Sequence, residues 1–216
     1  STNLNNLMTP TLTGKDYIKV SENTLISKGE ILKGKTWDDT HFALAEEGLF
    51  MLPPNLFMLH YSKIRDAAQG KLILYDGNKD AILRVEAEDI WNSLSSQYRG
   101  GCWTWLDAKF KKINGVLHIN YNHGFVDGEL QPQKTEKLED CVNEDCFVDL
   151  IFNNQGLPIQ KSKKQKYQQG NNIYFYHPKN GSVARFFAGL GGAVLDCYGD
   201  PGDSGPAIGV FAVCKR

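Results

Sequence analysis

The sequence predicts an α+β fold in which helices and strands occupy different parts of the chain. Apolar residues at helical spacing lie mainly toward the middle, where they predict helices over residues 38–47, 55–69, 86–98 and 138–150. Short strand-like runs crowd the two ends and the last third. This segregation favours α+β over a doubly wound sheet, and no repeat of fixed period suggests another architecture.

The predicted helices have ordinary boundary signals. The first is expected to be capped by Asp39 or Thr40. The third is the best defined, because Ile90, Leu94 and Tyr98 lie four residues apart and form one apolar face.

Strands are indicated by alternating or aromatic runs between turn signals. The clearest early strand is residues 71–75, and others are expected at 17–20, 24–26, 115–120 and 173–176. The aromatic run at 102–108 is expected to pack in the core, since tryptophan buries a large area. Strand-like runs at 183–186 and 207–213 enclose a stretch rich in glycine and aspartate, which predicts a long irregular segment held between strands.

Composition bounds the class of function. The chain has 216 residues, of which 41% are hydrophobic and 23% charged, as in ordinary globular proteins. A net charge of −1 does not suit a nucleic-acid partner, which favours a basic face. No apolar run reaches the roughly 18 residues of a membrane span, so a soluble protein without membrane insertion is expected.

Cysteine and histidine spacing predicts neither a metal site nor a disulfide framework. The five cysteines are an odd number without a C-x-x-C pair, so reduced and mostly buried thiols are expected. Cys141 and Cys146 have the wrong spacing for zinc. His118 and His123 lie five residues apart on a strand and its turn, which is not a metal-binding pattern either.

The C-terminal segment, residues 183–216, contains Gly-Asp-Ser-Gly around Ser204, as in the nucleophile stretch of chymotrypsin-like proteases. Only 12 residues follow Ser204, too few to build a specificity pocket, and no histidine lies in a setting typical of that family. The carboxylates of the segment fit no calcium loop, and its glycines lack the lysine of a phosphate-binding loop. No enzyme, metal or cofactor is therefore expected, and a serine hydrolase using Ser204 is kept as an alternative.

A spaced pattern of fixed residues runs through the same segment: Val183, Ala184, Arg185, Phe186, Ala188, Ala193, Leu195, Cys197, Pro201, Ser204, Pro206, Ala207, Ile208, Gly209 and Val210. Blocks at residues 56–61, 74–76, 102–107 and 155–158 accompany it. Together they resemble the variable proteins that diversity-generating retroelements target in prokaryotes and viruses. The resemblance spans roughly residues 50–216.

This resemblance implies a fold similar to C-type lectins, with short strands, two helices and a long irregular C-terminal binding segment. Residues 1–70 would pack on or precede a lectin-like domain of residues 71–216, with the variable region at about 184–213. The retroelement randomises adenines, and diversified AAC codons yield no Lys, Glu, Gln, Met or Trp. These five types form about a fifth of the chain, yet none occurs between Phe186 and Val213.

The resemblance also marks exchangeable, ligand-binding positions: Phe187, Gly189, Leu190, Gly191, Gly192, Val194, Asp196, Tyr198, Gly199, Asp200, Gly202, Asp203 and Gly205. The residues between them, such as Phe186, Leu195 and Cys197, would be scaffold. If the scaffold residues pack inward, the marked positions face outward and can change without harm to the core.

We therefore expect a non-enzymatic protein whose diversified surface binds a protein or other cell-surface ligand, without nucleic acid. The sequence does not fix the compartment; display on a virion or cell surface fits the resemblance. A static lectin-fold adhesion module is a further alternative. The sequence departs from related families in two respects: Cys197 and Cys214 do not resemble the reactive cysteine pair of the sulfatase-modifying members. Lectin-type calcium motifs are missing too, so a sugar ligand does not follow from the fold.

Overall fold

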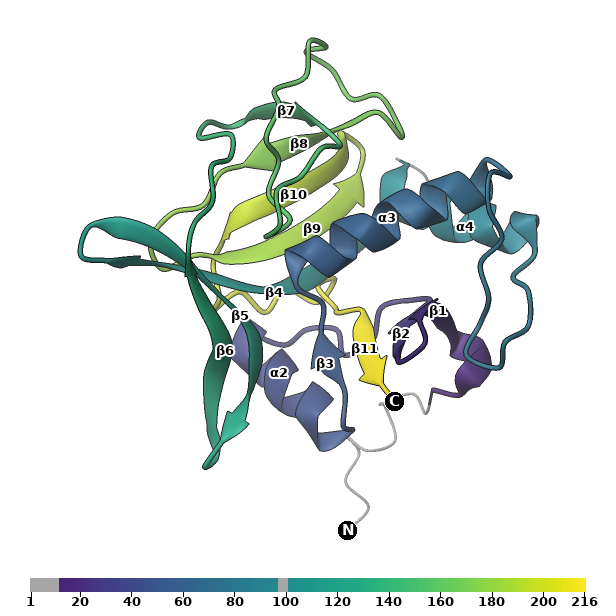
Figure 1. The fold of residues 1–216 in the computed structure, drawn as a ribbon, viewed down its shortest axis with the longest axis horizontal. Coiled ribbons are helices and arrows are strands. Elements are labelled where there is room, and N and C mark those ends of the chain that lie inside the picture. The colour runs from purple at the N-terminus through teal and green to yellow at the C-terminus, as the bar shows by residue number, and fades with distance from the viewer. Residues whose placement is uncertain (1–11, 97–100) are drawn as a thin grey trace.

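The computed structural model describes residues 12–96 and 101–216 and confirms the α+β class. The described helices are α2 (Trp37–Glu46), α3 (Pro54–Ala68) and α4 (Arg84–Ser95), preceded by a 3-10 turn at Gly14–Asp16. Two mainly antiparallel sheets complete the fold (Figure 1). The described part of the chain thus has three helices, where the resemblance implied two.

The smaller sheet joins the two ends of the chain. In spatial order it contains β1 (Tyr17–Ser21), β2 (Thr24–Ser27), β11 (Ala212–Lys215) and β3 (Phe50–Met51). β11 pairs antiparallel with both β2 and β3, and Val213 lies opposite Ile26 on one side and Phe50 on the other. The strands expected at 17–20 and 24–26 are confirmed. Residues on both sides of the proposed boundary at residue 70 contribute to this sheet.

The larger sheet has seven strands. In spatial order they are β6 (Glu129–Lys137), β5 (Val116–Val126), β4 (Cys102–Ile113), β9 (Val183–Gly189), β10 (Gly192–Gly199), β8 (Asn172–Tyr176) and β7 (Cys146–Asp149). β10 and β8 run parallel, and the other neighbouring pairs are antiparallel. The strands expected at 115–120, 173–176 and 183–186 are confirmed, each with longer bounds.

One face of the larger sheet, which we call the inner face, packs against α3 (Figure 1). The fully buried ring of Phe186 lies 4.7 Å from Phe57 and 5.4 Å from Tyr61, both on α3. Leu195 lies opposite Phe186 and Phe175 lies opposite Leu195, so all three side chains share this face. The other face of the same strands is the outer face.

The helices near the sheet begin and end close to their predicted bounds. α3 begins at Pro54, where the fixed backbone angle of proline suits the first turn. The cap of α2 differs from expectation: Thr36, not Asp39 or Thr40, accepts the backbone N–H of Asp39, at 3.2 Å. The helix expected at 86–98 is α4, which begins at Arg84 and ends at Ser95, where the following Ser96 is already extended; Tyr98 lies outside the described residues.

The helix predicted over residues 138–150 is wrong. Backbone groups there bond outside the segment: Val142 N–H donates to the Pro158 carbonyl, and Asp149 N–H donates to the Gln160 carbonyl. Residues from Cys146 onward form β7, which pairs with β8. Tertiary pairing here overrides a weak helical spacing.

The strand predicted over residues 71–75 is also wrong. Only isolated bridges form around it, and Ile73 and Tyr75 are exposed. Asp76 Oδ1 accepts the backbone N–H groups of Asn78 and Asp80, at 2.8 and 3.0 Å. These bonds turn the chain back before a ladder can form.

The long irregular segment predicted between residues 186 and 207 is largely regular. β9 and β10 form a hairpin whose turn is Leu190 and Gly191. Irregular structure is confined to residues 200–211, with single bridges at Gly209 and Val210 before β11. The expected run at 207–213 is therefore a regular strand only from Ala212.

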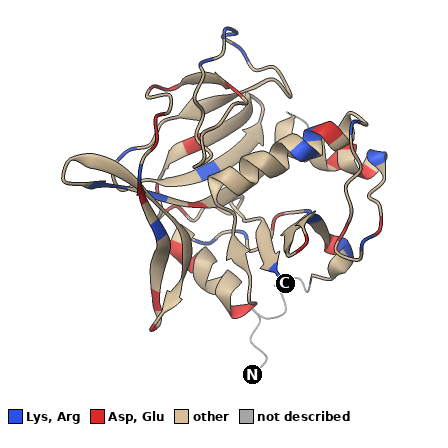
Figure 2. Ribbon diagram, viewed as in Figure 1, with Lys and Arg blue, Asp and Glu red and all other residues tan. Residues whose placement is uncertain are grey.

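Charged residues avoid the central strands. β8, β9 and β10 carry only Arg185 and Asp196 between them, whereas Lys, Arg, Asp and Glu are interspersed over α4 and the loops (Figure 2). No helix in the described ranges is both long enough and apolar enough to cross a membrane.

Candidate ligand-binding surface

Five side chains form a continuous row across the outer face of the larger sheet. Trp103 lies opposite Phe187, Phe187 opposite Val194, Val194 opposite Tyr174, and Tyr174 opposite Phe147. Residues directly opposite one another in neighbouring strands point to the same face. The row therefore crosses β4, β9, β10, β8 and β7, and we call it the aromatic row.

The rings of the aromatic row contact one another and remain accessible. Trp103 and Phe187 stack with centroids 4.1 Å apart and planes 11° apart. Phe147 and Tyr174 meet edge to face at 5.0 Å. Val194 is buried among these rings, whereas the four aromatic residues are each partly exposed. The result is an apolar strip that solvent or a partner can reach.

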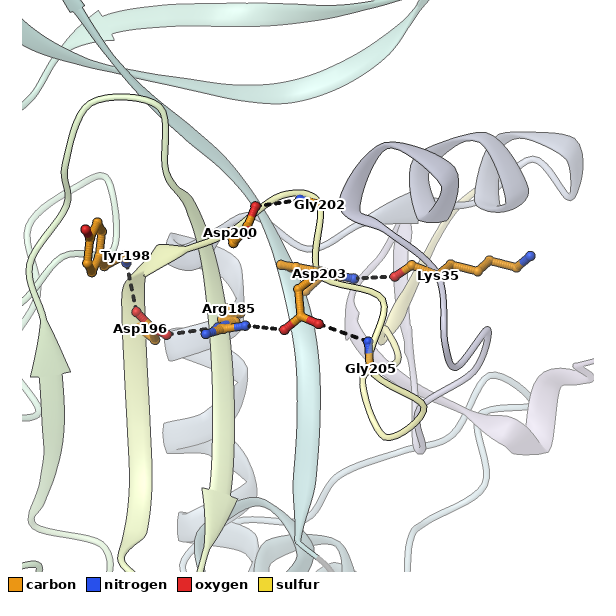
Figure 3. A network of polar contacts seen from close by, with 9 residues as sticks. Lys35, Arg185, Asp196, Tyr198, Asp200, Gly202, Asp203 and Gly205 are labelled. Atoms are coloured by element: carbon orange, nitrogen blue, oxygen red, sulfur yellow. Dashed lines mark hydrogen bonds and ion pairs between the residues drawn. The ribbon is translucent and has the colours of Figure 1, made fainter.

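A polar network centred on Arg185 lies next to Trp103 of the aromatic row. Figure 3 shows the contacts of this network. Arg185 donates from Nε to Asp196 Oδ2 at 2.9 Å and from Nη1 to Asp203 Oδ2 at 3.0 Å. Its guanidinium lies 5.4 Å from the ring centroid of Trp103. Asp196 Oδ1 accepts the backbone N–H of Tyr198 at 2.8 Å. Arg185 thus ties the hairpin, the following loop and the aromatic row together.

The loop after β10 is held in place by its own turns. Asp200 accepts the backbone N–H of Gly202 at 2.9 Å, and Asp203 accepts that of Gly205 at 3.0 Å (Figure 3). Gly209 then bonds to the backbone of β4. The loop is therefore positioned on the outer face, with the side chains near its tip directed to solvent or to Arg185.

The positions marked by the resemblance fall into three groups by exposure. The exposed ones are Leu190, Gly191, Tyr198, Asp200 and Gly202. The half-buried ones are Phe187, Gly189, Asp203 and Gly205. The buried ones are Gly192, Val194, Asp196 and Gly199. The scaffold residues Phe186, Ala188, Ala193, Leu195, Cys197 and Ile208 are all buried, as expected, and Pro201 is half-buried.

The buried group corrects the expectation that every marked position faces outward. A Cβ added to Gly192, which has φ of 99°, would lie 2.2 Å from the ring of Tyr167. A Cβ added to Gly199 would lie 2.8 Å from the Val183 carbonyl oxygen. Side chains at these two positions therefore require a shift of the ring or of the backbone.

Several residues of the surface were not predicted as site residues. Trp103 was expected in the core together with Trp105, and the two point to the same face because they are two residues apart. Of these two residues, only Trp105 is fully buried. The segment around Lys35 covers its ring, and its Nε1 donates to the Lys35 carbonyl at 3.0 Å. Tyr174 and Phe147 were not singled out because only the sheet register brings them beside Phe187.

The described contacts of Ser204 and the cysteines give no activated nucleophile. Ser204 is exposed in the loop, and no hydrogen bond among the described residues joins its hydroxyl to a histidine. All five cysteines are free thiols. Burial raises the pKa of the Cys102 and Cys197 thiols well above the usual value, which keeps both protonated.

A half-buried carboxyl, that of Glu30, contacts the backbone of Trp103. Glu30 Oε1 accepts the backbone N–H of Trp103 at 3.2 Å, while Oε2 is buried without a hydrogen-bond partner among the described residues. Burial raises the pKa of Glu30 from 4.5 to about 7, although the charge of Lys33 opposes the change. Between these two values the folded state holds a proton that the unfolded chain has lost.

We expect the free energy of unfolding to fall as pH rises from about 4.5 to 7, by about 1.5 kcal/mol through Glu30 after allowing for its partial exposure. Glu30→Gln keeps an oxygen for the Trp103 N–H but cannot ionise. Urea unfolding of both proteins across this pH range measures the difference. If the free energy of unfolding of the variant falls by the same amount between pH 4.5 and 7, Glu30 is not the source of the pH dependence.

Comparison of the chain with protein-family models, curated proteins and solved structures finds no match. The geometry of the outer face therefore carries the functional inference.

Proposed function

We propose that this chain is a non-enzymatic binding protein, whose outer sheet face and adjoining loop at residues 200–205 bind the surface of a partner protein. The observation that carries the proposal is the partly exposed aromatic row across five strands. Removing apolar surface from water on binding a complementary partner is favourable by about 25 cal/mol per Å². Contiguous exposed apolar groups of this kind are typical of interaction sites.

The chemistry of the face suits protein recognition. Aromatic rings supply large, rigid contacts that lose little conformational entropy on binding, and they often dominate interface energy. Arg185 is already fixed by two carboxylates, so it can contact a partner without further ordering. Tyr198, with the Lys179 ammonium 4.6 Å from its ring centroid, adds an exposed amphipathic group at the edge.

We further propose that the fold is C-type-lectin-like and that residues 184–213 are the variable region of a retroelement target displayed on a cell or virion. The exposed marked positions lie at the hairpin turn, on the outer face and in the loop, whereas the scaffold residues within β9 and β10 are buried. Exposed positions can change without repacking the core. The missing Lys, Glu, Gln, Met and Trp between Phe186 and Val213 support the same origin.

A displayed library tests whether this face is a binding platform. One library diversifies the five exposed marked positions, Leu190, Gly191, Tyr198, Asp200 and Gly202. A matched library diversifies five exposed residues of β6, namely Glu129, Gln131, Gln133, Lys134 and Thr135. Both are selected on one purified protein with no relation to the chain. We expect binders mainly from the first library.

Trp103→Ala in the selected binders then locates the contact. If the aromatic row is the anchor, the substitution weakens binding by at least about 10-fold, or 1.4 kcal/mol. Equal recovery of binders from the β6 library, or binding that is insensitive to Trp103→Ala, would contradict the proposal. Circular dichroism of each variant checks that the fold is kept.

A further inference from the structure

A second cluster of ionisable side chains lies away from the aromatic row, where α2 packs against β4 and β5 (Figure 1). His41 of α2, Asp107 of β4 and His123 of β5 meet there. Their side chains are 4%, 3% and 4% exposed, and one possible ligand atom from each lies within 4.8 Å of the others. Trp37 packs edge-on against both imidazole rings, with centroids 4.3 and 5.0 Å away.

Asp107 is the centre of this cluster. Its Oδ1 lies 2.5 Å from His123 Nδ1 and 3.6 Å from His41 Nε2, and its Oδ2 accepts the backbone N–H of His123 at 3.0 Å. Within the described residues, the ion pairs of Asp107 involve histidines alone and neither Lys nor Arg. A carboxylate buried this deeply is costly unless a positive charge compensates it.

His41 supplies an independent observation. Its Nε2 is buried without a hydrogen-bond partner among the described residues, and 3.6 Å from Asp107 is too long for a bond. In the tautomer protonated on Nδ1, the Nε2 lone pair and the Asp107 carboxylate repel each other. A cation bound between them would be attracted to both groups and would remove this repulsion.

We propose that His41, Asp107 and His123 bind one divalent transition-metal cation of the zinc class. Two imidazoles and a carboxylate are a ligand set that Zn²⁺ and related cations favour. With metal–ligand bonds of 2.0 to 2.1 Å, tetrahedral ligand atoms lie about 3.3 Å apart. The 2.5 and 3.6 Å separations bracket this value, so shifts of about 1 Å bring the three groups into position.

The cluster also offers an open coordination position. Asp107 and His123 line a cavity of about 290 Å³ that opens between β3, β5 and β11. Its polar wall residues include Asn122, Gln133 and Lys215, which can bind a water or a small anion that completes the coordination. This site is independent of the aromatic row and of the binding function proposed for it.

Metal titration of the chelator-treated full chain tests the proposal. We expect Zn²⁺ to bind with 1:1 stoichiometry in calorimetry, and Co²⁺ to give visible absorption bands without a thiolate charge-transfer band. Loss of a ligand in His41→Gln or His123→Gln should weaken binding by at least about 100-fold. His177→Gln is the matched control, because His177 pairs with Asp145 at 2.6 Å in a more exposed setting.

Imidazole nitrogen NMR of the unsubstituted protein keeps the test valid if a variant fails to fold. Zn²⁺ should move the resonances of His41 and His123 and leave those of His118 and His177 in place. The proposal is overturned by the absence of 1:1 binding, by a thiolate signature that assigns the metal to the free cysteines, or by equal binding in His41→Gln and the control.

Discussion

Replacing Phe186 with alanine is expected to lower the free energy of unfolding by about 4 kcal/mol. The ring is fully buried on the inner face, between Phe57 and Tyr61 of α3. Because β9 lies in the middle of the larger sheet, the neighbouring strands and α3 cannot collapse onto the cavity left behind. Urea unfolding followed by circular dichroism measures the loss.

Phe187 provides the matched control, since it is the next residue and carries the same ring. It points to the outer face, where it is partly exposed and stacks on Trp103. Phe187→Ala should therefore cost about 1 kcal/mol. Equal losses for the two variants would mean that β9 does not separate a core face from a binding face.

Asp196→Ala is expected to lower the free energy of unfolding by about 2.5 kcal/mol. The carboxylate is buried and accepts hydrogen bonds from Arg185 Nε and the Tyr198 backbone N–H. The substitution leaves that N–H without its acceptor and leaves Arg185 with Asp203 alone. The loss should be measured by urea unfolding at neutral pH.

Asp200→Ala is the control for this prediction, because Asp200 is exposed and accepts one local bond from Gly202. It should cost about 0.5 kcal/mol. If Asp196→Ala costs no more than Asp200→Ala, the Arg185 network does not stabilise the hairpin. Asp196 would then be as free to vary as the exposed positions.

The sequence predicts well the elements whose signal is local. α3 and α4 follow from apolar spacing, and β8 follows from an aromatic run. Predictions failed where distant backbone groups decide the outcome. Residues 138–150 have weak helical spacing, but the Pro158 carbonyl and β8 compete successfully for their backbone.

The candidate surface could be predicted only in part. The pattern in the C-terminal segment is enough to mark Phe187 and Tyr198 as ligand-binding positions. Tyr174 and Phe147 join them through strand order and register, which no local pattern encodes. Trp103 and Trp105 differ in exposure because a segment from the other end of the chain covers one of them.

The metal-ligand candidates were missed for the same physical reason. His41, Asp107 and His123 are separated by 66 and 16 residues, so no spacing rule brings them together. The spacing of His118 and His123 argued against a metal role for this pair, but it says nothing of partners for His123 from α2 and β4. Buried polar clusters of this kind become visible only in three dimensions.

Sequencing around the gene tests most directly our proposal that residues of the outer face and its loop vary between copies of the protein. We expect a reverse transcriptase gene and a near-identical repeat of the codons for residues 184–213. The repeat should differ at its adenines, chiefly at codons of exposed positions such as Leu190, Tyr198 and Asp200. A neighbourhood without such a repeat, together with related copies identical between residues 187 and 205, would contradict the claim.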